Sequence, residues 1–137
     1  MKCIVQTPCF NEETTLESVL SEIPKHIDGI DCIETLIIDD GSSDQTLEVA
    51  KKCGVHHIIV HGNNRGLGNA FRSGIEKSLL QGADIVINTD GDNQYPGKYI
   101  PNLVKKMQET GAHIVMGDRQ TKKIAHFSLL KKFFQWF

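Results

Sequence analysis

Two carboxylates stand one residue apart just after an apolar run in the second half of the chain. Asp90 and Asp92 belong to the stretch TDGDNQYP, which follows ADIVI at 83–87. Two such charges repel each other, and a fold keeps them together chiefly where a cation or a hydrogen-bond network neutralises them. Mg²⁺ or Mn²⁺ accepts carboxylate and carbonyl oxygens and completes its shell with water and phosphate oxygens. Asp90, Asp92 and Gln94 therefore predict a metal site that faces a diphosphate.

A polar surface turn is the main alternative for this stretch, because Asp, Gly and Asn are common turn residues. A calcium-binding EF-hand loop does not fit, since it needs Gly at its sixth position and Glu at its twelfth, where this chain has Tyr95 and Pro101. An aspartyl nucleophile of the haloacid-dehalogenase type usually follows the first strand, and Asp90 comes much later. The stretch is therefore either a metal site or a turn.

Two more polar loops have both a structural and a functional interpretation. In DDGSSDQT at 39–46, Ser43 or Asp44 is a good N-cap for a following helix, and Asp40 stays free to accept hydrogen bonds from a ligand. The glycine-rich HGNNRGLG at 61–68 opens a helix, where N–H groups attract an anion or small residues allow close packing. It is neither a dinucleotide fingerprint, which follows the first strand, nor a Walker loop, which needs Gly-Lys-Ser/Thr.

Short β-branched runs alternate with amphipathic stretches along the chain. The predicted strands cover 3–7, 34–39, 55–61, 84–89 and 112–117. The predicted helices carry apolar positions at Leu16, Val19, Leu20 and Ile23, at Leu47 and Ala50, at Phe71, Ile75 and Leu79, and at Ile100, Leu103, Val104 and Met107. This alternation predicts an α/β, Rossmann-like fold with a mostly parallel sheet and helices on both faces. In such sheets ligands bind beyond the carboxyl ends of the strands. We expect five polar loops to open there, which are TPCFNE, DDGSSD, HGNNRGLG, TDGDNQYP and GDR.

Composition narrows the class of protein. The chain has 137 residues, 39% of them hydrophobic, which suits one globular domain, and a formal net charge of −2 gives no basic footprint for nucleic acid. No secretory h-region and no apolar run of ~18–20 residues occurs, so we expect a cytoplasmic protein. Cys3, Cys9, Cys32 and Cys53 form no C-x-x-C pair, which predicts reduced thiols, with zinc as a remote alternative.

The composition changes after Arg119. Lys122, Lys123, Lys131 and Lys132 are offset by no acidic residue, and the chain ends in FFQWF. We therefore divide the chain into a core at 1–119 and a basic aromatic segment at 120–137, and we expect an N-terminal fragment of a longer protein. The segment either contacts an anionic membrane, where each Lys contributes about 1 kcal/mol, or packs as a core helix on residues beyond the chain.

The motifs TPCFNEE, DDGSSD, RGLGNAFRSGI, TDGDNQYP and GDR occur in this order, each after or near the end of a predicted strand. Together they resemble the family-2 glycosyltransferases of GT-A fold, and most of all the branch of dolichol-phosphate mannose synthase and polyprenyl-phosphate glycosyltransferases. The resemblance covers essentially residues 2–137. It implies roles for individual residues. Pro8, Phe10 and Glu12 hold the base and ribose, Asp40 receives an N–H of the base, Asp90 and Asp92 form the D-x-D pair with Asp92 on the metal, Gln94 adds a ligand, and Arg119 lies near the diphosphate.

The resemblance also implies an activity. It predicts a metal-dependent, inverting transfer of a hexose from a UDP- or GDP-sugar to a polyprenyl phosphate, at the cytoplasmic face of a membrane. The lysines of the basic aromatic segment would hold the lipid phosphate or anionic head groups. Gly91 stands where the family usually has alanine, a difference that we expect to be harmless. A soluble glycan or protein acceptor, a non-catalytic nucleotide-binding module and a homo-oligomer stay open.

Overall fold

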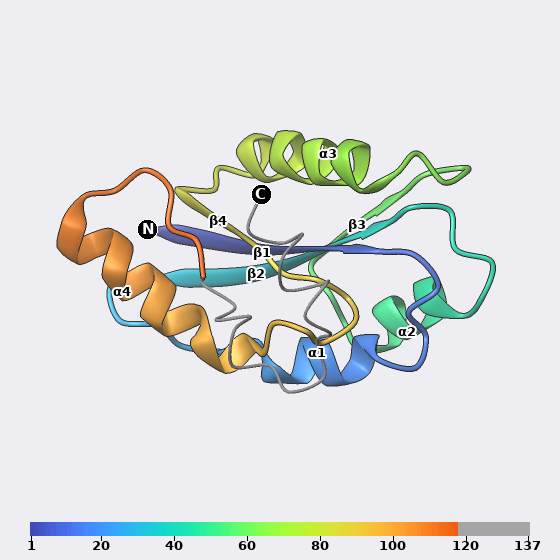
Figure 1. The fold of residues 1–137 in the computed structure, drawn as a ribbon, viewed down its shortest axis with the longest axis horizontal. Helices are drawn as coiled ribbons and strands as arrows, with labels where there is room; N and C mark the ends of the chain where they lie inside the picture. Colours follow the sequence, from blue (N-terminus) through green and yellow to red (C-terminus); the bar gives the residue numbers. More distant parts are fainter. Residues whose placement is uncertain (118–137) are drawn as a thin grey trace, which may run out of the picture.

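Four parallel strands form one sheet in the order β3-β2-β1-β4 in the computed structural model, which describes residues 1–117 (Figure 1). The strands are β1 (Lys2–Cys9), β2 (Cys32–Asp39), β3 (His57–Val60) and β4 (Ile85–Asn88). Cys9 is aligned with Asp39, and Asp39 with Val60, so the carboxyl ends of three strands are level. The loops that follow these strands therefore emerge at the same edge of the sheet.

Helices cover both faces of this sheet (Figure 1). α3 (Leu67–Leu80) lies on one face, and α1 (Leu16–Glu22), α2 (Thr46–Lys52) and α4 (Ile100–Thr110) lie on the other, with a short 3-10 helix η1 (Gly97–Tyr99) before α4. The predicted α/β architecture is confirmed. None of the helices within residues 1–117 has the length and apolar character that a membrane span requires.

Side chains that alternate along the strands build a core on each face. On the α3 face, Ile4, Leu36 and Ile38 pack against Ala70. The opposite face buries two clusters, which are Cys3, Val5, Ile23, Ile27, Ile30, Ile85, Ile87, Ile100 and Val104, and Cys9, Leu16, Ile37 and Ala50. Each fully buried aliphatic side chain contributes about 1.5–3 kcal/mol. The sheet is therefore held from both sides, which fixes the strand ends that position the polar loops.

The buried face of α3 differs from the predicted one. Phe71 and Leu79, which we expected to form the apolar stripe with Ile75, are 43% and 63% exposed. The buried positions of α3 are Ala70, Gly74 and Ser78. A Cβ on Gly74 would lie only 2.9 Å from Cδ1 of Ile38, so the helix sits too close to the sheet for a large side chain. The pattern of apolar residues alone does not reveal this distance.

The predicted fifth strand at 112–117 is wrong. These residues adopt no strand conformation, and Ile114 and Met116 are 80% and 86% exposed. Alternation of apolar and small residues suits a strand, but a strand also needs a hydrogen-bonding partner, and no strand within residues 1–117 pairs with this segment.

Gly111 ends α4 in the left-handed conformation at φ 66°, as its position after the apolar stripe predicts.

Glu34 forms an ion cluster at the edge of the sheet away from the polar loops. Its Oε2 lies 2.6 Å from Nε2 of His57 and 2.9 Å from Nζ of Lys2. Hydrogen bonds from His57 and then from Lys2 lower the pKa of Glu34 from 4.5 to about 2. The carboxylate is therefore more acidic in the folded than in the unfolded chain.

We expect Glu34 to stabilise the fold above pH 4.5 and to lose this contribution as the pH falls from 4.5 toward 2, because the unfolded chain takes up the proton first. Between pH 6 and pH 3 the free energy of unfolding should fall more in the wild type than in Glu34→Gln, by on the order of 1–2 kcal/mol. Urea denaturation at each pH measures this difference, with Glu109→Gln on the exposed face of α4 as the matched control. Equal pH dependence in wild type and Glu34→Gln would contradict the assignment.

Candidate functional site

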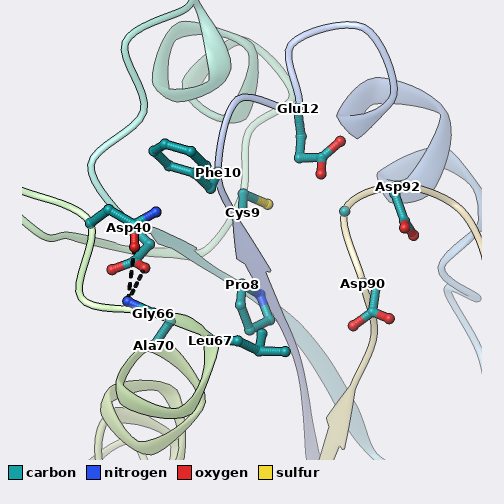
Figure 2. Close-up of a pocket in the computed structure, with 12 residues that line it drawn as sticks. Pro8, Cys9, Phe10, Glu12, Asp40, Gly66, Leu67, Ala70, Asp90 and Asp92 are labelled. Carbon is teal, nitrogen blue, oxygen red and sulfur yellow. Dashed lines mark hydrogen bonds between the residues drawn. The ribbon is translucent and has the colours of Figure 1, made fainter.

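A pocket of about 410 Å³ opens at the carboxyl ends of β1, β2 and β4, beside the start of α3. Its walls are Pro8, Cys9, Phe10, Glu12, Asp40, Asn64, Gly66, Leu67, Ala70, Asp90, Gly91 and Asp92. All seven residues expected to contact the nucleotide or its diphosphate are among them: Pro8 lies on β1, and Phe10, Glu12, Asp40, Asp90, Gly91 and Asp92 lie on three separate loops. Figure 2 shows Phe10 and Asp40 on one side, with Glu12, Asp90 and Asp92 on the other.

Not every predicted site residue lies in this pocket. Gln94 is exposed and is not among the lining residues, but its N–H donates a 3.0 Å hydrogen bond to Oδ1 of Asp92. That bond helps to orient the Asp92 carboxylate. Arg119, Lys122, Lys123, Lys131 and Lys132 lie outside the described residues 1–117.

The loops after β1 and β2 are hydrogen-bonded to each other. The bonds run from the N–H of Asn11 to Oγ of Ser42 (3.0 Å), of Glu12 to Oγ1 of Thr46 (2.8 Å), of Glu13 to Oδ2 of Asp44 (3.1 Å), of Ser43 to Oδ1 of Asn11 (2.9 Å) and of Gln45 to Oε2 of Glu13 (2.9 Å). Gln45 occupies the N-cap position of α2 with no side-chain cap, but Oδ1 of Asp44 accepts a 2.9 Å bond from the N–H of Thr46, the first residue of α2, so the predicted capping by Asp44 is met one residue earlier. The two loops act as one wall of the pocket.

The turn that carries Asp90 and Asp92 is packed against the loop after β1. The hydroxyl of Thr15 lies 2.7 Å from the carbonyl oxygen of Gly91 and 2.9 Å from Oε2 of Glu12. A Cβ on Gly91 would lie 3.1 Å from both Sγ of Cys9 and Cγ of Glu12. Alanine would fit only if these neighbours moved by a few tenths of an ångström, so glycine has a packing role here that we did not expect.

Cys9 is a buried thiol in the pocket wall. Burial, followed by the nearby carboxylates of Glu12, Asp39 and Asp44, raises the pKa of Cys9 to about 12. The thiol is therefore protonated at neutral pH, and a nucleophilic role would need the thiolate. Cys9 packs as an apolar group, in line with the predicted reduced state, and all four cysteines are free.

Asp40 is not free, which corrects the expectation for this residue. The side chain is buried, and Oδ1 lies 2.6 Å from Nδ1 of His61 and accepts a 3.0 Å bond from the N–H of Arg65. Oδ2 accepts a 2.8 Å bond from the N–H of Gly66, drawn in Figure 2. Burial raises the pKa of Asp40, but the hydrogen bonds from His61, Arg65 and Gly66 outweigh burial and lower the pKa below its usual value. Asp40 is therefore an ionised hydrogen-bond acceptor.

Sequence reasoning missed His61 and Thr15. The ring of His61 binds Asp40 across two loops, a contact that no motif predicts. The signal was its position, because His61 follows β3 at the same level at which Asp40 follows β2. Thr15 had no comparable signal, since its partner Gly91 is 76 residues away along the chain.

Comparison with known proteins gives the family. A family model described as Glycosyl transferase family 2 matches residues 4–131. A dolichyl-phosphate hexose transferase from Haloferax volcanii is 33% identical over 113 residues, which are 82% of this chain and 46% of that protein. A dolichol-phosphate mannosyltransferase from Pyrococcus furiosus is 28% identical over 137 residues, which are 96% of this chain and 38% of that protein. The chain thus spans about half the length of such relatives, or less.

Solved structures agree on the fold. The glucosyl-3-phosphoglycerate synthase from Mycobacterium tuberculosis, in complex with Mn²⁺, UDP and glucosyl-3-phosphoglycerate, superposes with a TM-score of 0.63 at 28% identity, over 77% of this chain and 39% of that one. A mannosyltransferase from Pyrobaculum calidifontis, in complex with GDP-mannose and Mn²⁺, gives 0.63 at 22% identity over 77% and 32%, a likeness of fold alone. The GT-A fold is confirmed, and the chain belongs to glycosyl transferase family 2.

Proposed function

We propose that the pocket binds the nucleoside diphosphate of a sugar donor. In the whole protein, the hexose would pass with inversion from a UDP- or GDP-sugar to a polyprenyl phosphate. The observation that carries this proposal is the convergence of Pro8, Phe10, Glu12, Asp40, Asp90, Gly91 and Asp92 on one pocket at the carboxyl edge of a parallel sheet. The polyprenyl-phosphate transferases among the relatives support the acceptor class.

The donor set fits a hard divalent ion, Mg²⁺ or Mn²⁺. Asp90 and Asp92 offer carboxylate oxygens on one side of the pocket (Figure 2). Within residues 1–117 no three His, Cys, Asp or Glu side chains converge as a metal site. The chain would therefore supply two carboxylates, with Gln94 as a possible third oxygen donor, and leave the other positions to water and the diphosphate, as is usual for Mg²⁺. When bound, such an ion neutralises charge on the leaving diphosphate.

Different residues of the pocket would bind the base and the sugar hydroxyls of the donor. Phe10, which is 45% exposed, and Pro8 present an apolar surface for the base beside Asp40, and Glu12 would accept hydrogen bonds from sugar hydroxyls. The acceptor oxygen would form a bond to the anomeric carbon while the bond from that carbon to the diphosphate breaks. A phosphate acceptor is already ionised near neutral pH, so no strong general base is needed. Arg119 would stabilise the departing charge.

The lysines at 120–137, beyond the described residues, have a proposed role in binding the acceptor. Within the division into a core at 1–119 and a basic aromatic segment at 120–137, Lys122, Lys123, Lys131 and Lys132 would hold the lipid phosphate or anionic head groups at the cytoplasmic face of a membrane. A soluble acceptor is the second candidate, because the 28% identical synthase was solved with glucosyl-3-phosphoglycerate. Flotation with anionic liposomes separates the two, since only a membrane-bound protein floats with the lipid.

Calorimetric titration of the purified chain with UDP and with GDP, each with and without Mn²⁺, tests the proposal. We expect one of the two nucleotides to bind, at least about tenfold more tightly with Mn²⁺, because the cation screens the repulsion between the diphosphate and the paired carboxylates. Binding of neither nucleotide, or affinity that ignores Mn²⁺, would count against the site. CMP and inorganic phosphate serve as controls for unspecific binding.

A further inference from the structure

A buried chain of hydrogen bonds runs behind the pocket wall from Asp40 to α3. Nδ1 of His61 lies 2.6 Å from Oδ1 of Asp40, and Nε2 of His61 lies 3.1 Å from Oγ of Ser73. The His61 side chain is only 5% exposed, so water does not compete for either nitrogen. Because an ionised carboxylate only accepts, Nδ1 must carry a hydrogen, and Nε2 is left for the hydrogen bond with the Ser73 hydroxyl.

The lone pairs of Asp40 are almost fully used by the protein. An ionised carboxylate has about four acceptor positions. His61 and the N–H of Arg65 occupy two on Oδ1, and the N–H of Gly66 occupies one on Oδ2. Among the hydrogen bonds of residues 1–117, one acceptor position on Oδ2 is therefore left for a ligand, and Asp40 lines the pocket. A ligand in the pocket can therefore donate a hydrogen bond to Asp40 only at Oδ2.

We infer that His61 is a positioning residue for the nucleotide: it locks the Asp40 carboxylate so that its last acceptor position receives an N–H group of the base. The inference rests on the proposed function of the pocket. The backbone donors of Arg65 and Gly66 come from the loop before α3 and bind one oxygen of Asp40 each, whereas His61 comes from the end of β3 and binds Oδ1. Without the ring donor, Oδ1 keeps only the bond from the N–H of Arg65, and the carboxylate can rotate toward other donors.

This role of His61 concerns the base of the ligand and not its diphosphate. Asp40 and His61 lie on the side of the pocket opposite Asp90 and Asp92, as the positions of Asp40, Asp90 and Asp92 in Figure 2 show. If the Asp40 carboxylate is no longer held in place, the affinity for the base should fall and the affinity for the diphosphate should stay unchanged. A loss of general stability would instead weaken both.

Two amide variants supply the test. Asn at position 61 places an N–H near the site of Nδ1, whereas Gln places it near the site of Nε2. His61→Asn therefore keeps the donor to Asp40 and loses the contact with Ser73, and His61→Gln does the reverse. The probes are UDP, GDP and inorganic pyrophosphate, each titrated with Mn²⁺ against folded protein. Ser73→Ala, which removes only the far contact, is the matched control.

We expect His61→Gln to bind the preferred nucleotide about tenfold more weakly than wild type, and His61→Asn and Ser73→Ala to stay within about threefold. Pyrophosphate affinity should be equal in all four proteins. Equal nucleotide affinities of His61→Asn and His61→Gln, or a parallel loss for pyrophosphate, would overturn the positioning role alone. A wild type that binds pyrophosphate with Mn²⁺ but neither nucleotide would overturn the proposed function, and this inference with it.

Discussion

Asp92→Ala should abolish the gain in nucleotide affinity that Mn²⁺ gives to the wild-type chain. The variant removes one of the two carboxylates that line the pocket and that we propose as metal ligands. Alanine offers no oxygen to the cation, so the gain of at least about tenfold that we expect from Mn²⁺ in the wild type should disappear in the variant. Calorimetry with UDP and GDP, with and without Mn²⁺, measures that term.

The same experiment has two built-in comparisons. Asp92→Asn keeps an oxygen donor but removes the charge, so it should retain part of the Mn²⁺ effect. Asp28→Ala removes an exposed carboxylate that pairs with the exposed His26, away from the pocket lining, and it should behave as wild type. Unchanged metal dependence in Asp92→Ala would take Asp92 out of the site, and the stretch from 89 to 96 would then be a polar turn that its own hydrogen bonds hold together.

The sequence was sufficient to predict where the site lies, for a physical reason. In a parallel sheet every strand ends at the same edge, so polar loops that follow successive strands must meet there. Asp40 after β2 and Asp90 after β4 are 50 residues apart, yet both line the pocket. The short apolar runs of β1, β2 and β4, separated by amphipathic stretches, were enough to infer this, because parallel strands buried on both faces are near-continuous apolar runs.

What the sequence did not reveal depends on distances between elements. The small residues Gly74 and Ser78 form the buried face of α3 because the helix lies close to the sheet. The segment 112–117 has the pattern of a strand but finds no partner within the described residues. Asp40 was expected to be free because its donors, His61, Arg65 and Gly66, are 21 to 26 residues away. Such tertiary contacts override local propensity.

Gly41→Ala should be strongly destabilising, and it should weaken nucleotide binding in whatever fraction stays folded. Gly41 adopts φ +80°, and a Cβ there would lie 2.6 Å from the carbonyl carbon of Asn63 and 2.7 Å from the backbone nitrogen of Asn64. Backbone atoms cannot turn aside as a side chain can, so the loop before α3 must shift. That loop continues into Arg65 and Gly66, whose N–H groups bind Asp40. The wall of the pocket and the fold are thus disturbed together.

Backbone strain and steric overlap both lower the free energy of unfolding of Gly41→Ala, and a variant at a second glycine separates the two contributions. A left-handed φ costs an L-residue about 1 kcal/mol, and forced overlap in a packed region costs about 1–3 kcal/mol more, so the free energy of unfolding should fall by about 3 kcal/mol. Gly54 adopts φ +68° with nothing within 4 Å of an added Cβ, so Gly54→Ala should lose only about 1 kcal/mol. Urea denaturation of both variants gives the difference, which reports the contact between the two loops alone. If the two variants lose equal stability, the loop before α3 yields to the added methyl group, and the rigid placement of Asp40 that the proposed nucleotide site requires is not a property of this fold.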